Sequence, residues 1–195
     1  MIVNTMSQHT IHTETLLAHS GRAQKITGGT VNTPVYRAST LLFPTVDALR
    51  SVHGTIHTYG RHGNPTTRAL ESALCELEGA YGAMLTPSGL SALTCALLAT
   101  LKPGDHLLMT DSVYDPTRAF CDGALKRLGI ETTYYDPLIG AGIRSLMRPN
   151  TKVVFVESPG SLTFEVQDIP AISQVAHEHG ALVMLDSTWG TPVHF

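Results

Sequence analysis

The sequence contains few of the residues that mark a disulfide-rich or zinc-binding protein. Its 195 residues include only three cysteines, Cys75, Cys95 and Cys121, which are odd in number, unclustered and placed in segments that we expect to be helical. This arrangement favours buried, reduced thiols over a disulfide framework or a zinc site. The cysteine content therefore predicts a cytoplasmic protein.

Charge of one sign and long apolar runs are also scarce. Lys and Arg number 13 and Asp and Glu number 16, which gives a formal net charge of -3. This balance provides no electrostatic reason to bind nucleic acid or an anionic membrane. No segment is long and apolar enough to span a bilayer, and residues 1–22 lack the charged-then-apolar pattern of a signal peptide. We therefore predict a soluble protein with neither a nucleic-acid nor a membrane partner.

Histidine is more abundant, but its spacing does not favour a metal site. The candidate pairs are His9 with His12 and His177 with His179. The second pair is two residues apart on an expected helix, so its side chains face different directions. We predict no metal.

The first 60 residues are predicted to differ from the rest of the chain. They mix Thr, Ser, His, Gly and Pro without a sustained period, which predicts an extended N-terminal arm. A mobile tail is the alternative. Apolar pieces such as residues 41–43 would be costly to leave in water, so we expect the arm to pack, for example on a neighbouring subunit.

From residue 66 onward, helical and strand patterns alternate, in a chain whose 43% hydrophobic residues suffice for a packed core. We expect helices from 66 to a stop at Gly79, over 88–101, 116–128 and 168–179, and near 143, with strands at 83–86, 105–110, 130–135, 153–156 and 181–185. The strands are mostly apolar, which predicts an α/β fold with a mainly parallel sheet covered on both faces. Ligands bind outside the carboxyl ends of such strands.

Residues 87–92 join an expected strand to an expected helix and form a candidate phosphate site. Ser88 is placed to cap the helix, and Gly89 would let an anion approach the free backbone amides. Small residues at a helix start also serve simply as caps or packing residues, and both interpretations stay open.

Four further residues combine a polar or aromatic side chain with a strand end or a loop. Asp186 follows four apolar residues, where it would either cap a turn or pair with a cation in a pocket. Tyr114 would stack on a flat ring or pack half-buried. Tyr59 and Arg61 offer a hydroxyl and a guanidinium suited to phosphate, or a surface ion pair.

Taken together and in order, these motifs resemble one enzyme family. The run 59–66 (YGRHGNPT), the segment 87–92 (PSGLSA), Tyr114, the segment 157–159 (ESP) and the segment 186–188 (DST) follow the pattern of the Cys/Met-metabolism family of pyridoxal-phosphate enzymes. The resemblance implies pyridoxal 5'-phosphate as cofactor and the large domain of a fold-type-I transferase. It also implies a homotetramer built as a dimer of dimers. Residues 1–60 would be the arm that contacts a neighbouring subunit, and residues 61–195 an incomplete, N-terminal part of the cofactor domain.

The resemblance also implies how the phosphate is held. Ser88, Gly89 and Leu90 would hold it within one subunit, while Tyr59 and Arg61 would reach the phosphate of the neighbouring subunit. Two chains would then complete one site.

Four residues would serve the cofactor ring. Tyr114, the catalytic candidate, would stack on the pyridine ring, and Asp186 would pair with its protonated nitrogen. Thr188 would support the same pocket. Ser161 stands where the family usually has an asparagine that contacts the cofactor hydroxyl and the substrate.

Within the family, the segment 157–161 (ESPGS) and Trp189 resemble the bacterial cystathionine β-lyase branch. This implies a carbon-sulfur lyase that converts cystathionine to homocysteine, pyruvate and ammonia in methionine biosynthesis. The segment Asn64 to Thr66 is shared with γ-lyases and γ-synthases, so a methionine or cystathionine γ-lyase or a γ-synthase is an alternative.

The family's Schiff-base lysine lies downstream of the aspartate, in a Ser-x-Thr-Lys setting that none of the lysines here occupies: Lys25, Lys102, Lys126 and Lys152. We therefore expect the chain to be truncated and inactive by itself. A catalytically silent cofactor-binding or dimerisation fragment is the alternative of another class.

Overall fold

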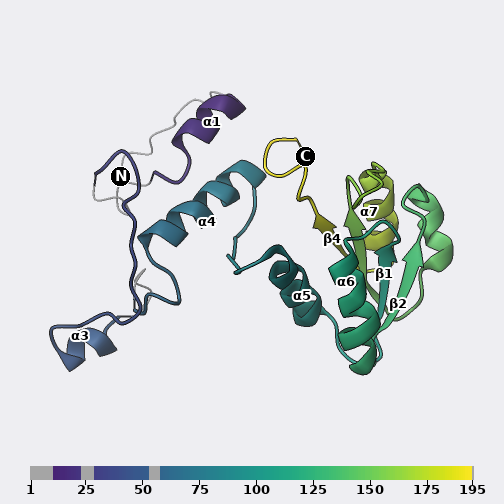
Figure 1. The fold of residues 1–195 in the computed structure, drawn as a ribbon, viewed down its shortest axis with the longest axis horizontal. Coiled ribbons are helices and arrows are strands. Elements are labelled where there is room, and N and C mark those ends of the chain that lie inside the picture. Colours follow the sequence, from purple (N-terminus) through teal and green to yellow (C-terminus); the bar gives the residue numbers. More distant parts are fainter. Residues whose placement is uncertain (1–10, 23–28, 53–57, 195) are drawn as a thin grey trace, which may run out of the picture. The chain divides into compact units, whose positions relative to one another are not determined.

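A computed structural model describes residues 11–22, 29–52 and 58–194 of the chain. The chain divides into two units, residues 1–85 and residues 86–195, which we treat separately. Figure 1 draws the first from purple to teal and the second from teal to yellow. Within the described residues, no helix has the length and apolar content needed to cross a membrane.

The second unit is built on a four-stranded sheet in the order β2-β1-β3-β4, with every neighbouring pair parallel. The strands are β1 (His106–Thr110), β2 (Glu131–Tyr135), β3 (Thr151–Glu157) and β4 (Leu182–Asp186). The helices between and before them are α5 (Gly89–Thr100), α6 (Asp115–Phe120), the 3-10 helix η2 (Gly140–Leu146) and α7 (Ile169–Glu178). This confirms the predicted α/β fold with a parallel sheet.

Helices cover both faces of the two central strands. On one face, Leu107 and Met109 of β1 pack in a cluster that includes Leu97 of α5. On the other face, Leu108 packs in a cluster that includes Ile172 of α7. Neighbouring residues of a strand point to opposite faces, and both faces of β1 are covered, so its consecutive apolar residues at 107–109 follow from this placement.

His106 and Thr110 are the polar residues of β1, and both are fully buried. The Nδ1 of His106 lies 2.8 Å from the Thr151 hydroxyl and its Nε2 lies 2.9 Å from the Thr133 hydroxyl. Burial is the main cause that lowers the pKa of His106, and the nearby Arg148 lowers it further. The neutral ring is therefore the form that the fold accommodates.

Three sequence predictions for residues 66–195 were wrong in detail. Residues 83–86 are not a strand, because a strand needs a partner for its backbone groups and none pairs with them among the described residues. The helix predicted over 116–128 is interrupted by a π-helical turn, η1 (Cys121–Leu125), which includes Gly123, a weak helix former. Burial holds for Cys121, but Cys95 is exposed and Cys75 is intermediate.

The first unit contains α1 (Thr13–His19), α3 (Val46–Arg50) and α4 (Pro65–Glu78). The predicted helix from residue 66 with a stop at Gly79 is α4, whose last turn closes with Gly79 in the left-handed region at φ 60°. It begins at Asn64, whose side chain accepts from the amides of Thr66 and Thr67. The sequence patterns did not reveal α1 or α3. The role of residues 1–60 as an arm on a neighbouring subunit stays a prediction.

Candidate functional site

A pocket of about 470 Å³ opens in the second unit where the carboxyl ends of strands meet the start of α5. Its position agrees with the rule that open parallel sheets bind ligands beyond their carboxyl ends. The structure brings together every predicted site residue of this unit on its wall: Ser88, Gly89, Leu90, Tyr114, Ser161, Asp186 and Thr188.

The start of α5 supplies one polar corner of this pocket. The Ser88 hydroxyl accepts from the amide of Ser91 at 3.1 Å, and the Ser88 carbonyl accepts from the amide of Ala92 at 3.0 Å. The amides of Gly89 and Leu90 precede these bonds, so the helix itself does not use them. A Cβ on Gly89 would meet nothing within 4 Å, which leaves room for a group to approach. Ser88 is thus a cap, and the same helix start suits an anion.

The carboxylate of Asp186 forms a second corner, at the end of β4. One oxygen, Oδ1, accepts from the backbone amide of Thr188 at 3.0 Å and from its hydroxyl at 2.6 Å. Asp186 therefore closes a turn, as one interpretation predicted, and also faces the pocket. Thr188 fixes the orientation of the carboxylate through these two bonds.

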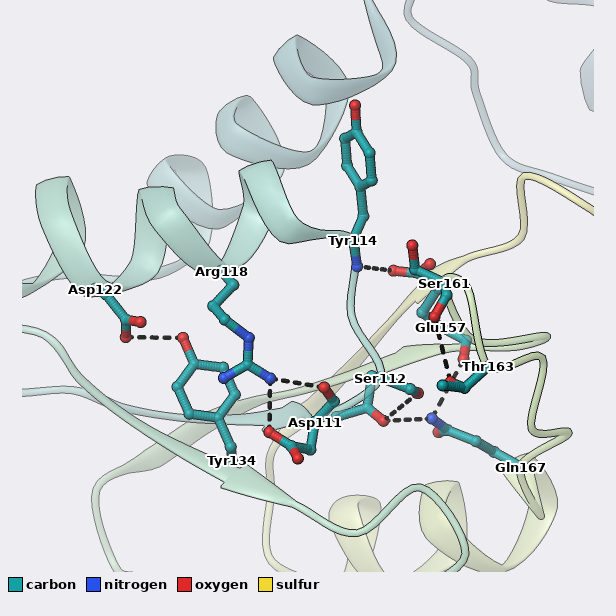
Figure 2. A network of polar contacts seen from close by, with 11 residues as sticks. Asp111, Ser112, Tyr114, Arg118, Asp122, Tyr134, Glu157, Ser161, Thr163 and Gln167 are labelled. Atoms are coloured by element: carbon teal, nitrogen blue, oxygen red, sulfur yellow. Dashed lines mark hydrogen bonds and ion pairs between the residues drawn. The ribbon is translucent and has the colours of Figure 1, made fainter.

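Tyr114 reaches the pocket from the loop between β1 and α6. Its side chain is 45% exposed. Figure 2 shows the ring extending away from the polar network that holds its backbone. The Tyr114 amide donates to Oε2 of Glu157 at 2.8 Å. The ring is thus available to a ligand while its backbone is anchored.

Glu157 is a pocket residue that the sequence interpretation did not select as a site. It ends β3 directly beside Asp186 of β4, and it is only 6% exposed. Burial raises the pKa of Glu157 to about 7, and the charge of Asp186 adds to this, while the amides of Tyr114 and Ser161 oppose it. The sequence did contain a signal for Glu157. Like Asp186, it is a carboxylate at the end of an apolar strand.

Apolar side chains that sequence reasoning also missed complete the wall: Leu93, Leu162, Phe164 and Trp189. Phe164 and Trp189 meet edge to face, with ring centroids 5.3 Å apart. Leu162 and Phe164 adopt φ of 65° and 60°, a region that residues other than glycine rarely occupy. No turn signal in the sequence predicts this, so the fold of this loop could not be read in advance.

Tyr59 and Arg61 belong to the first unit, and whether they reach a pocket of this kind stays a prediction. The Tyr59 hydroxyl accepts from the Ser39 hydroxyl at 3.4 Å, and its ring meets that of His62 edge to face at 5.2 Å. Arg61 is exposed.

Together, the fold and the pocket define an α/β protein whose sheet edge offers a ligand the start of a helix, an exposed aromatic ring and a carboxylate. The chain belongs to the Cys/Met metabolism PLP-dependent enzyme family, which matches residues 14–195. The family's cofactor is pyridoxal 5'-phosphate. This confirms the family and the cofactor that the sequence motifs predicted.

Individual relatives share this region. A Rhizobium johnstonii protein with a provisional cystathionine beta-lyase name is 55% identical over 181 residues, which are 93% of this chain and 46% of that protein. Cystathionine beta-lyase of Escherichia coli is 44% identical over 190 residues, 93% of this chain and 48% of that protein. The crystal structure of cystathionine gamma-lyase from Lactobacillus plantarum with L-serine is 29% identical with a TM-score of 0.83, over 93% of this chain and 46% of that one. The chain spans about half the length of the curated relatives it matches.

Proposed function

We propose that this chain is the cofactor-binding part of a pyridoxal-phosphate carbon-sulfur lyase of the cystathionine β-lyase type, which releases homocysteine, pyruvate and ammonia from cystathionine. The observation that carries the proposal is the single pocket that joins the start of α5, the Tyr114 ring and the Asp186 carboxylate. The E. coli relative, 44% identical, supports the choice of substrate.

The pocket residues fit the cofactor. A phosphate would bind at the start of α5, where Ser88 caps the helix and the amides of Gly89 and Leu90 are not used by it. Tyr114 would stack on the pyridine ring, and Ser161 would contact the cofactor hydroxyl and the substrate. Tyr59 and Arg61 of a neighbouring subunit would complete the phosphate site in a homo-oligomer.

Bound pyridoxal phosphate would supply an electron sink for negative charge at the α-carbon of the substrate. Asp186 would hold the proton on the ring nitrogen, because a carboxylate beside that atom favours its protonated form. Thr188 would keep the carboxylate turned toward the ring through its two hydrogen bonds. Phe164 and Trp189 would exclude water along one wall.

Proton transfer would require a lysine that this segment does not place in the pocket. The lysines within the described residues, Lys102, Lys126 and Lys152, are absent from the pocket wall. The 195-residue chain by itself is therefore proposed to bind the cofactor without turning over cystathionine.

A chimaeric enzyme tests the proposal. Residues 1–195 are joined to the part of the E. coli relative that follows its matched region, and the keto acid formed from cystathionine is identified. We expect pyruvate from the chimaera and none from the 195-residue chain. Formation of 2-oxobutyrate instead would support the alternative γ-lyase function, which the L. plantarum structure makes the second candidate. An inactive chimaera that still binds cofactor would favour a silent binding module.

A further inference from the structure

The loop that carries Tyr114 is anchored at both of its ends. At its start, Arg118 donates to the carbonyl and to the carboxylate of Asp111, both at 2.6 Å, while its guanidinium lies 3.9 Å from the centroid of the Tyr134 ring. At its end, the Tyr114 amide donates to Glu157. Figure 2 shows these two anchors on opposite sides of the loop.

The backbone of Tyr114 is held on both of its polar groups. Its carbonyl accepts from the amides of Thr117 at 2.9 Å and Arg118 at 3.2 Å, which starts α6. Its amide is not part of the helix, since Tyr114 occupies the N-cap position, with φ -48° and ψ 125°. Glu157 is the acceptor for this amide, so a buried carboxylate holds the side of Tyr114 that the helix does not.

The sheet does not need a carboxylate at position 157. Residues 153–156 of the same strand are buried and apolar, and β3 stays in register with β4 through to Glu157. A buried carboxylate is unfavourable unless it is well paired, so an apolar residue would suit the strand better. The Glu157 carboxylate is stabilised by the amide of Tyr114, on the loop that carries the aromatic ring of the pocket, and by the amide of Ser161.

We propose that Glu157 is a positioning residue, whose buried carboxylate holds the backbone amide of Tyr114 and thereby fixes the Tyr114 ring over the pocket. This rests on the proposed function, in which that ring contacts the cofactor. Glu157 acts through Tyr114, whereas Asp186, its neighbour on β4, would contact the cofactor directly.

Three variants of the 195-residue chain test the proposal. Glu157→Leu keeps the approximate size but removes the acceptor, and Glu157→Gln keeps an acceptor oxygen without the charge. Val156→Ala is the matched control. It creates a cavity on the same strand, but in the cluster packed against α7, on the face of the sheet opposite to the Glu157 side chain. The first readout is hydrogen exchange of the Tyr114 amide, measured by NMR without any ligand.

The second readout is affinity for pyridoxine 5'-phosphate. This compound carries an alcohol in place of the aldehyde and therefore cannot form a Schiff base with lysine amines. Trp189 is the single tryptophan of the chain and lines the pocket, so its fluorescence reports binding. Losing a hydrogen bond to a charged group changes an equilibrium constant by a factor of roughly ten to a hundred. We expect Glu157→Leu to speed exchange of the Tyr114 amide and to weaken pyridoxine 5'-phosphate binding, each by about that factor. Glu157→Gln, whose neutral oxygen still accepts, should recover part of each effect, and Val156→Ala should change neither.

Two outcomes would overturn the positioning role, and a third would overturn the proposed function. Unchanged exchange of the Tyr114 amide in Glu157→Leu would show that the carboxylate does not hold it and would overturn the proposal. Faster exchange with unchanged affinity would overturn the positioning role while leaving the cofactor site intact. If the unmodified chain fails to bind pyridoxine 5'-phosphate, the proposed function fails, and the exchange measurement alone still tests the hold of Glu157 on Tyr114.

Discussion

Replacing Glu157 by Gln should remove a pH dependence of folding stability that the buried carboxylate creates. The pKa of Glu157 is raised from 4.5 to about 7, chiefly by burial. Between these two values the folded chain keeps a proton that the unfolded chain has released, so the free energy of unfolding falls as the pH rises through this window. Below about pH 4.5 the penalty is absent, and above about pH 7 it is fully present.

The expected change in the free energy of unfolding follows from the same pKa shift. One pKa unit corresponds to about 1.4 kcal/mol, so between about pH 5 and pH 8 the unmodified chain should lose roughly 2 to 3 kcal/mol of stability relative to Glu157→Gln. The comparison with the variant matters because other groups titrate in the same range. His106, for example, contributes a slope of opposite sign.

Urea unfolding at a series of pH values measures this difference. Fluorescence of Trp189 follows the second unit specifically, since it is the single tryptophan of the chain. Glu78→Gln, at an exposed position at the end of α4, is the control and should run parallel to the unmodified chain. Parallel curves for the chain and Glu157→Gln would refute the reasoning, because they would mean that the amides of Tyr114 and Ser161 offset the cost of burial.

Three more outcomes are expected. In the active chimaera, Asp186→Asn should lower turnover by two or more orders of magnitude, which is about 3 kcal/mol of barrier, and should cost about 1 kcal/mol of stability or less. An unchanged kcat with a lowered melting temperature would instead mean that Asp186 only caps a turn. Gly89→Ala should weaken pyridoxine 5'-phosphate binding about tenfold, or 1.4 kcal/mol, while Gly82→Ala, an equally open glycine outside the pocket, should not; equal affinities in a fluorescence titration would remove the phosphate from the start of α5. Because the pKa of His106 is lowered, stability should fall as the pH drops below about 6.5, and His106→Gln should flatten this acid limb in urea unfolding; an unchanged limb would mean that other groups cause it.

The sequence predicted the second unit well because local patterns and burial agree there. Apolar strands such as residues 153–156 could be assigned from composition alone, since both faces of a central parallel strand are buried. The side of the sheet that carries the site was predictable from the same topology, because the carboxyl ends of parallel strands meet at one side of the sheet. Seven predicted residues therefore share one pocket although they span residues 88–188.

Features that depend on tertiary contacts were not predictable from local patterns. The backbone of Leu162 and Phe164 takes positive φ without any glycine to signal it. Glu157 was overlooked because its importance comes from the amide of Tyr114, which is 43 residues away in the sequence. Residues 83–86 look like a strand but have no partner strand among the described residues, which propensity alone does not reveal.

A crystal structure of the 195-residue chain with pyridoxine 5'-phosphate tests the central claim most directly. We predict the phosphate within hydrogen-bond distance of the amides of Gly89 and Leu90, the ring against Tyr114 and the ring nitrogen beside Asp186. A ligand bound elsewhere, or in this pocket with its ring nitrogen turned away from Asp186, would contradict the account.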